Sequence, residues 1–233
     1  MLRIDHLSGR WALAAGLLVL SACNHATSPR AVQAVMVNVK ANATPLAPSP
    51  AAGPVEITGL RLVIGQAALG NGDQFGCVDC EGDQEDATPA PAVVTVPVDG
   101  SPVSVAAERV AAGRYSSVEI ELATPSAALL AATPGWTAGG TIEVRGRYNG
   151  VDFTLSLPIP GQFRETLSPA IDVPPGGLPG PINVTIALPV ASWFSSNGIA
   201  LDPSDPAARA QIAANARASI TVESETEREG AER

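Results

Sequence analysis

Histidine is nearly absent from this sequence. It occurs 2 times in 233 residues, as His6 and His25, both close to the N-terminus. The rest of the chain therefore cannot assemble a Ser-His-Asp or Cys-His nucleophile, nor a zinc or copper site built from imidazoles. Paired carboxylates remain available for acid catalysis, although no pair stands out. The composition argues against most classes of enzyme.

Aromatic residues and basic patches are also scarce. Phe, Trp and Tyr make up 4% of the chain, whereas it contains 22 glycines and 21 prolines. This composition suits short strands joined by many turns and does not suit a helical bundle. The formal net charge is −9, and the excess acids lie in residues 71–90 and 223–233. No basic patch is present for nucleic acid, so nucleic-acid binding is excluded.

The N-terminal segment has the features of an export signal. Arg3 and Arg10 precede an uncharged, largely apolar run over residues 11–20, which the small residues Ser21 and Ala22 follow. This run is about half the ~20 residues that a membrane-spanning helix needs. We therefore predict a cleaved signal and not an integral membrane helix.

The end of this segment, Leu20-Ser21-Ala22-Cys23, resembles the lipobox of bacterial lipoproteins. The resemblance implies that residues 1–22 are a lipoprotein signal peptide and that Cys23 carries acyl chains such as palmitate. Several acyl chains hold a protein firmly at a membrane, because each buried CH₂ contributes about 0.8 kcal/mol. Asn24 is not the Asp that retains lipoproteins at the inner membrane of enteric bacteria, which favours the outer membrane. An ordinary secretory signal is the alternative.

The rest of the chain divides by composition. Residues 23–54 are rich in Pro, Ala and Ser and are predicted to be a lipidated tether, with a first strand at 34–40 if the alternation there joins a sheet. Residues 55–222 are predicted to be the folded domain, with an acidic, cysteine-containing insertion at 70–91. Residues 223–233 have no apolar content beyond Ala231 and are predicted to be a disordered charged tail.

The folded domain shows the two-residue alternation of β-strands. The clearest case is a pair of alternating runs around Asn149-Gly150, which predicts a hairpin. Helices are predicted after Ser126 and from Asp205-Pro206 to about Asn215. With about eight to ten short strands and one or two short helices, we predict an all-β, mostly antiparallel β-sandwich.

Two further segments carry a second resemblance. They are Val110-Ala111-Ala112-Gly113-Arg114-Tyr115 and the spaced set Trp193-Phe194, Gly198, Leu201-Asp202-Pro203, Ile212 and Asn215. Both are similar to segments of uncharacterised bacterial lipoproteins that carry a β-sandwich domain of unknown function. The resemblance implies a surface or periplasmic sandwich and brings no catalytic residues.

Cys77 and Cys80 form a Cys-Val-Asp-Cys motif in the acidic insertion. Zinc needs about four ligands and only these two thiols are at hand. A redox dithiol needs a lowered thiol pKa, which the neighbouring acids Asp79 and Glu81 oppose. We therefore predict a disulfide that closes a small loop in an oxidising compartment.

The same insertion offers hard oxygen ligands on a glycine-containing loop, which is what calcium requires. The candidate ligands are Asp73, Asp79, Glu81, Asp83, Glu85 and Asp86. Their spacing matches no EF-hand, and a solvated acidic loop is the alternative. No other cofactor is predicted.

Trp136 lies in a glycine-flanked stretch, Pro134-Gly135-Trp136-Thr137-Ala138-Gly139-Gly140. An exposed tryptophan there could stack on a sugar ring, whereas a ring folded back onto the sheet would have a structural role. Trp193 and Phe194 precede the last helix and are predicted to anchor it.

Together these features predict a lipid-anchored, extracytoplasmic binding or structural module of the cell envelope, not an enzyme. Its expected partners are the membrane, through the lipid, and a glycan or an envelope protein. Two alternatives remain: a calcium- or glycan-dependent adhesion domain and a carboxylate-dependent envelope enzyme. An adhesion domain should show an exposed aromatic or acidic loop cluster, and an enzyme a concave pocket with two facing carboxylates.

Overall fold

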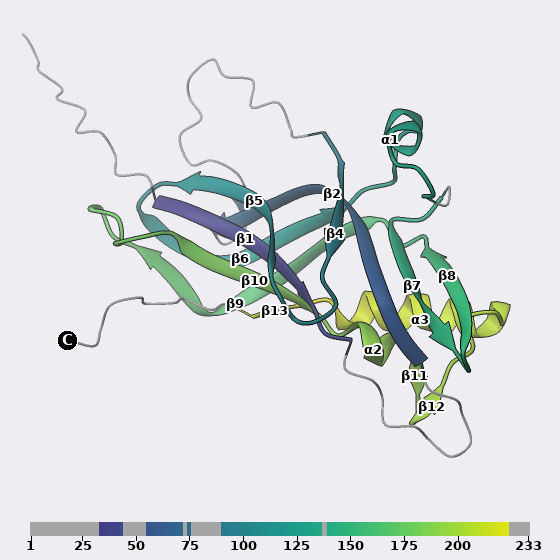
Figure 1. Cartoon of the computed structure of the whole chain (residues 1–233). Coiled ribbons are helices and arrows are strands. Elements are labelled where there is room, and N and C mark those ends of the chain that lie inside the picture. Colours follow the sequence, from purple (N-terminus) through teal and green to yellow (C-terminus); the bar gives the residue numbers. More distant parts are fainter. Residues whose placement is uncertain (1–32, 44–54, 72–73, 76–89, 137–138, 224–233) are drawn as a thin grey trace, which may run out of the picture.

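The computed structural model describes residues 33–43, 55–71, 74–75, 90–136 and 139–223 (Figure 1). Their strands form two larger sheets and a small ribbon, which share one hydrophobic core. All but one of the strand pairs are antiparallel. The prediction of an all-β, mostly antiparallel sandwich is confirmed.

The larger sheet has seven strands in the order β8-β7-β2-β6-β9, with β3 and β4 paired to other stretches of β2. Its strands are β2 (Val55–Asn71), β3 (Gln74–Phe75), β4 (Ala92–Val96), β6 (Gly113–Leu122), β7 (Ile142–Tyr148), β8 (Val151–Leu157) and β9 (Gly161–Val173). The smaller sheet has the order β13-β10-β1-β5, with β1 (Gln33–Ala41), β5 (Val103–Val110), β10 (Ile182–Leu188) and β13 (Thr221–Glu223). β11 (Ser195–Ser196) and β12 (Ile199–Ala200) form the ribbon.

β1 lies inside the smaller sheet, between β5 and β10. Val35, Val37 and Val39 point into the core and are 0% exposed. β1 and β10 are the parallel pair, with Val37 opposite Val184. The alternation at residues 34–40 therefore does form a strand, and the folded structure begins well before residue 55.

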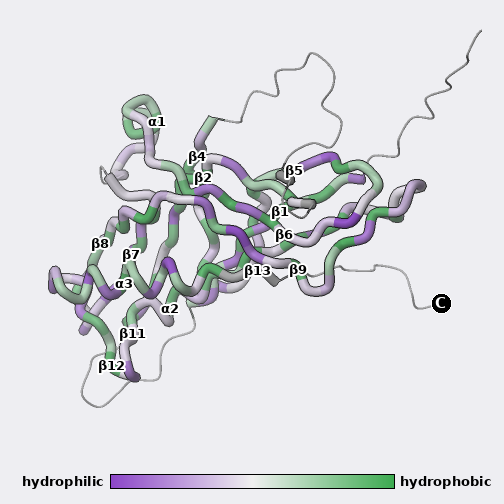
Figure 2. Tube along the Cα trace, turned by 180° about the vertical axis from the view of Figure 1, so that it is seen from behind, coloured by the Kyte–Doolittle hydropathy of each residue, from purple (hydrophilic) through white to green (hydrophobic). Residues whose placement is uncertain are grey.

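The core follows from the two-residue alternation of the strands. In β10, Ile182, Val184, Ile186 and Leu188 are buried and face the larger sheet's core residues. Figure 2 shows hydrophobic and hydrophilic stretches alternating along the strands. Each sheet buries one face against the other, which is how an antiparallel sandwich removes its apolar side chains from water.

The predicted hairpin at Asn149-Gly150 is confirmed as β7–β8. Asn149 and Gly150 have φ of 52° and 78°, the left-handed values that a two-residue type I′ turn requires. The register pairs Tyr148 with Val151 and Ile142 with Leu157. Gly146 lies where the ring of Phe153 crosses β7, and a Cβ there would lie 2.9 Å from Cζ of that ring.

The described part of the chain also contains three helices. α1 (Ala127–Ala132) is capped by Ser126, whose hydroxyl accepts from the N–H of Leu129 (3.2 Å). α3 (Pro206–Ser219) is capped by Asp205, which accepts from the N–H of Ala207 (2.9 Å). Both predicted N-termini are confirmed. α3 runs to Ser219, beyond the predicted end.

α2 (Val190–Trp193) leads into the contacts that dock α3. Trp193 and Phe194 are 0% exposed, and Nε1 of Trp193 donates to the hydroxyl of Ser219 (2.6 Å). Phe194 also packs against Phe153 of β8, with ring centroids 5.5 Å apart. Figures 1 and 2 both place α3 beside β7 and β8. The prediction that Trp193 anchors the last helix is confirmed, whereas for Phe194, whose ring packs on Phe153 of β8, it stays a prediction.

The pairing of β2 and of β5 adds to the sequence prediction. β2 continues to Asn71, into residues 70–91 that were predicted to be an insertion, and its register shifts between Ile57 and Gly59, which marks a bulge. The turn at Asp99-Gly100 does not close a hairpin: β4 pairs with β2, whereas β5 pairs with β1. The chain crosses from one sheet to the other there, and Asp99 bridges to Asn42.

Candidate functional site

Of the predicted site residues, the structure describes Trp136. The residues predicted for lipidation, for the disulfide and for calcium lie outside the described residues: Cys23, Cys77, Cys80, Asp73, Asp79, Glu81, Asp83, Glu85 and Asp86. The lipidation, disulfide and calcium sites stay predictions. Over the ranges that the structure describes, no three His, Cys, Asp or Glu side chains gather into a possible metal site.

Trp136 follows α1 in the chain and folds back against the molecule. Its backbone N–H donates to the carbonyl of Thr133 (3.2 Å), and its indole Nε1 donates to the carbonyl of Gly140 (3.2 Å). The side chain is half-buried. Because the indole N–H is used within its own loop, the ring orientation is fixed. The geometry matches the structural alternative for Trp136, and sugar stacking stays a prediction.

One face of the Trp136 ring lies near the guanidinium of Arg61. Cζ of Arg61, in β2, is 5.0 Å from the ring centroid, within the range of a cation–π contact. The same guanidinium donates from Nη2 to the carbonyl of Gly135 (3.1 Å). The loop before β7 is thus attached to β2 by a ring contact and by a backbone carbonyl.

Glu143 of β7 lies at the centre of these contacts. Its side chain is 1% exposed, and Oε1 accepts from both Nε (3.1 Å) and Nη2 of Arg61. Oε1 also accepts from Nε of Arg145 (2.9 Å). We call Arg61, Gly135, Trp136, Glu143 and Arg145 the Glu143 cluster. Charge-assisted hydrogen bonds of this kind compensate the cost of burying a carboxylate.

The second carboxylate oxygen, Oε2 of Glu143, is buried and makes no hydrogen bond within the described part of the chain. Two arginines against one carboxylate leave the cluster with one net positive charge. Arg145 is 48% exposed, so the outer side of the cluster faces solvent. These contacts attach the loop that carries Gly135 and Trp136 to strands β2 and β7.

The sequence did not single out Glu143. It stands in the alternation Glu143, Arg145, Arg147, which is typical of the solvent-facing side of a strand. Arg145 and Arg147 are indeed exposed, but Glu143 is covered by the loop that carries Gly135 and Trp136. The sequence did contain one signal: Trp136, whose side chain is large enough to cover a neighbour, lies shortly before Glu143, the first polar residue of β7.

A second carboxyl group, that of Glu108, is half-buried and lies near the C-terminal end of β2. Glu108 of β5 accepts a hydrogen bond from the N–H of Leu69 (3.1 Å). Burial raises the pKa of Glu108, and this hydrogen bond partly opposes the rise. Burial also raises the pKa of Tyr115, and the negative charge of Glu108 adds to that rise. The Tyr115 hydroxyl donates to the carbonyl of Ala111 (3.0 Å).

A bulge explains why Glu108 faces inward. The register of β5 against β1 shifts between Val37, opposite Ala106, and Asn38, opposite Ser104. The extra residue, Val105, reverses which residues of β5 face the core. Glu108 is therefore opposite the buried Val35. An uninterrupted alternation from Val103 would have left Glu108 outside.

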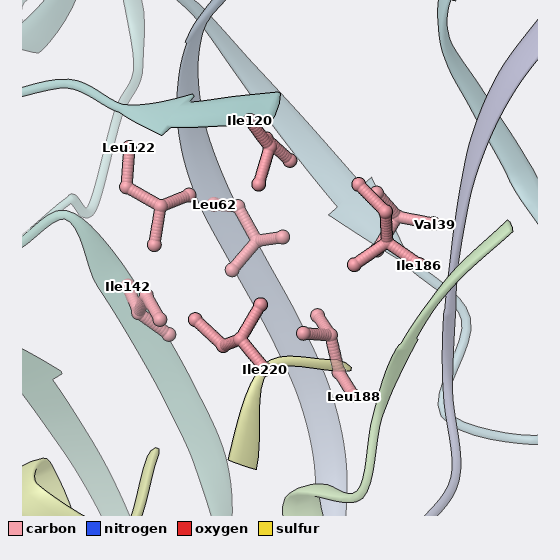
Figure 3. Close-up of a pocket in the computed structure, with 8 residues that line it drawn as sticks. All are labelled: Val39, Leu62, Ile120, Leu122, Ile142, Ile186, Leu188 and Ile220. Carbon is pink, nitrogen blue, oxygen red and sulfur yellow. The ribbon is translucent and has the colours of Figure 1, made fainter. Parts of the chain in front are cut away.

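A cavity of about 10 Å³ lies between the two sheets (Figure 3). Its lining is aliphatic throughout: Val39, Leu62, Ile120, Leu122, Ile142, Ile186, Leu188 and Ile220. A cavity of this size is at the lower limit for a single water molecule, and water also needs polar partners. It is a packing gap in the core, and it presents no carboxylates.

Comparison with protein-family models, with characterised proteins and with solved structures gave no match. Among the described residues, no helix is both long enough and apolar enough to cross a bilayer.

Proposed function

We propose that this protein is a lipid-anchored module of the bacterial cell envelope, whose β-sandwich binds or supports another envelope component. The observation that carries the proposal is the lipobox-like Leu20-Ser21-Ala22-Cys23 at the end of a short apolar run. Acyl chains on Cys23 would hold the mature chain at the outer membrane, with the sandwich facing the periplasm or the cell surface.

The position of β1 makes the proposed anchor a short one. Gln33, the first residue of β1, follows Cys23 by ten positions. A chain of ten residues spans at most about 35 Å when fully extended. The sandwich would therefore stay close to the lipid surface and could not reach far from it.

The surroundings of the buried carboxylate support a non-catalytic role. A carboxylate that acts as an acid or a base must face a substrate, usually with a second carboxylate opposite. Oε1 of Glu143 instead accepts hydrogen bonds from Arg61 and Arg145, beneath the loop that carries Trp136. These contacts favour a binding or structural module over the carboxylate-dependent enzyme.

Metabolic labelling with radioactive palmitate tests the anchor. We expect label in the wild-type protein and in a Cys77→Ser variant, and none in Cys23→Ser, which should also leave the membrane fraction. Cys77→Ser is the matched control, because it too removes one thiol. Label that persists in Cys23→Ser, or that is missing from the wild type, would contradict the proposal.

A glycan array tests the binding role that Trp136 suggested. The wild-type protein is compared with Trp136→Phe, which keeps a ring for stacking and loses the N–H that holds Gly140. A glycan that binds both proteins but not Trp136→Ala would identify stacking on this ring as the mode of recognition. If no glycan binds, the partner sought next is an envelope protein.

A further inference from the structure

One end of the sandwich gathers three segments that are far apart in the chain. Gln33, at the start of β1, is opposite Val110, at the end of β5. Gly113, at the start of β6, is opposite Val173, at the end of β9. The start of β1, the β5–β6 turn and the β9–β10 loop lie together at the left of Figure 1. We call this end the Gln33 end.

The β9–β10 loop is the most prominent part of the Gln33 end. Its sequence, residues 174–181, is Pro-Pro-Gly-Gly-Leu-Pro-Gly-Pro and contains no charged or hydrogen-bonding side chain. All of these residues are exposed except Gly177, which is half-buried, and Leu178 is 41% exposed. A large aliphatic side chain thus faces outward at the tip of the sandwich.

Gln33 holds this loop in place. Its Nε2 donates to the carbonyl of Gly180 (2.6 Å), and its Oε1 accepts from the N–H of Leu178 (2.6 Å). The Gln33 side chain is 4% exposed. The loop is also closed by a bond from the N–H of Gly177 to the carbonyl of Pro174 (2.9 Å). Leu178 is therefore presented on a preorganised backbone, which lowers the entropy cost of binding.

We propose that the Gln33 end rests on the membrane and that Leu178 enters the boundary between lipid headgroups and acyl chains. This inference relies on the proposed lipid anchor at Cys23. The residue that clamps the loop, Gln33, is also the described residue nearest to Cys23 in the chain. Acyl chains on Cys23 would bring the Gln33 end, before any other part of the sandwich, to the lipid surface.

The charges near the loop fit a lipid surface. Arg109 and Arg114 are exposed on the strands that flank the β5–β6 turn, and Asp172 lies opposite Arg114. Ala111 and Ala112, in the turn, are uncharged. Arginine side chains are long enough to reach phosphate groups while their stems stay in apolar surroundings. The end thus combines an uncharged tip with arginines set back from it.

A second copy of the chain is a less suitable occupant. A stable protein interface buries about 800 Å² on each partner, usually around several aromatic or aliphatic anchors. Among the described residues of the Gln33 end, Leu178 is the one large hydrophobic residue that is exposed. One leucine is enough to orient a module that lipids already hold, because the acyl chains supply the affinity.

Tryptophan fluorescence in brominated lipid tests the proposal. Lipidated Leu178→Trp and Val151→Trp proteins are reconstituted into phosphatidylcholine vesicles with or without bromine on the acyl chains, and the wild-type signal is subtracted. Val151 is the matched control: it is 70% exposed and lies next to the turn after Tyr148, which pairs with Val55 at the far end of β2. Both sites are exposed, so both variants should fold.

We expect the Leu178→Trp emission to shift to the blue and to fall about twofold in brominated vesicles, because a ring 5–10 Å inside the interface meets the bromines. The Val151→Trp emission should not change. Unquenched Leu178→Trp in protein that floats with the vesicles and carries palmitate would overturn this inference and leave the anchor intact. Equal quenching at both sites would also overturn it. Protein without palmitate would overturn the anchor and this inference together.

Discussion

Asn215 of α3 donates hydrogen bonds from Nδ2 to the carbonyls of Trp193 and Ser195, each 2.9 Å long. One amide side chain thus satisfies two backbone groups at the end of α2, where the chain turns towards the β11–β12 ribbon. Trp193 in turn donates to Ser219, near the end of α3. The bond between Asn215 and Trp193 therefore joins the first and the last residue of the spaced set described in the sequence analysis.

Asn215→Ala should lower the free energy of unfolding by about 2 kcal/mol, because two partly buried carbonyls lose their donor. Urea unfolding measures the change, with a shifted midpoint and an unchanged slope. Arg217→Lys is the control: Arg217 is exposed on the same helix, and the substitution keeps its charge. Equal midpoints for Asn215→Ala and wild type would show that α3 docks without these bonds.

Glu143→Gln should destabilise the fold by about 3 kcal/mol, since it leaves the guanidinium of Arg61, 16% exposed, without its carboxylate. Asp152→Asn is the matched control. It breaks the Arg147–Asp152 pair (2.7 Å), whose side chains are 55% and 80% exposed, and we expect no measurable change. Similar midpoints for the two variants in urea would contradict the central role of Glu143.

Gly146→Ala should cost about 2 kcal/mol, because its Cβ would overlap the backbone oxygen of Glu56 and press on the ring of Phe153. Gly176→Ala tests the same change where nothing lies within 4 Å of the new Cβ. The stability of Gly176→Ala should equal or slightly exceed that of the wild type, because alanine restricts the conformations of the unfolded chain. Thermal unfolding compares the two, and a stable Gly146→Ala protein would refute the close packing.

Glu108 should make stability depend on pH in a defined direction. Burial raises its folded-state pKa above the unfolded value, so the folded state favours the protonated carboxyl. The contribution of Glu108 to the free energy of unfolding is complete below its pKa in the unfolded state. This contribution is lost as the pH rises through its pKa in the folded state. Glu108→Gln keeps an acceptor for the N–H of Leu69 and has no charge to bury.

The test is urea unfolding of wild type and Glu108→Gln between pH 4.5 and pH 8. The free energy of unfolding of Glu108→Gln should increase relative to that of the wild type as the pH rises. Asp172→Asn, at an exposed position of β9, serves as the control for the loss of one negative charge. A constant difference between wild type and Glu108→Gln across the range would show that Glu108 is not perturbed by burial.

Local features predicted the elements that form from local interactions. The Asn149-Gly150 hairpin, the caps at Ser126 and Asp205, and the strand at residues 34–40 all appear as predicted, because turn geometry, capping and alternation act over a few residues. The end of β2 was missed. Its last residues, from Gly65 to Asn71, include two glycines and lack a clear alternation.

The Glu143 cluster could not be predicted in the same way. Arg61, Trp136 and Glu143 come from three separate segments, and only the pairing of β2 with β7 brings Arg61 opposite Glu143. The polar side of β7 predicts exposure for Glu143, and the loop above it reverses that expectation. The sequence did supply Trp136, whose folded-back alternative matches its observed contacts.

By itself, the sequence determined that this chain forms an all-β sandwich with a short helix starting at Asp205, because alternation and capping depend on neighbouring residues. Only the tertiary structure decided which carboxylates are withdrawn from water, Glu143 fully and Glu108 in part. Glu143 is covered by a loop, and Glu108 is turned inward by a bulge in β5. Only the tertiary structure, too, placed β1 beside β10 and clamped Leu178 to Gln33. Each of these outcomes depends on contacts between distant segments, and their energies are set by packing that no local pattern encodes.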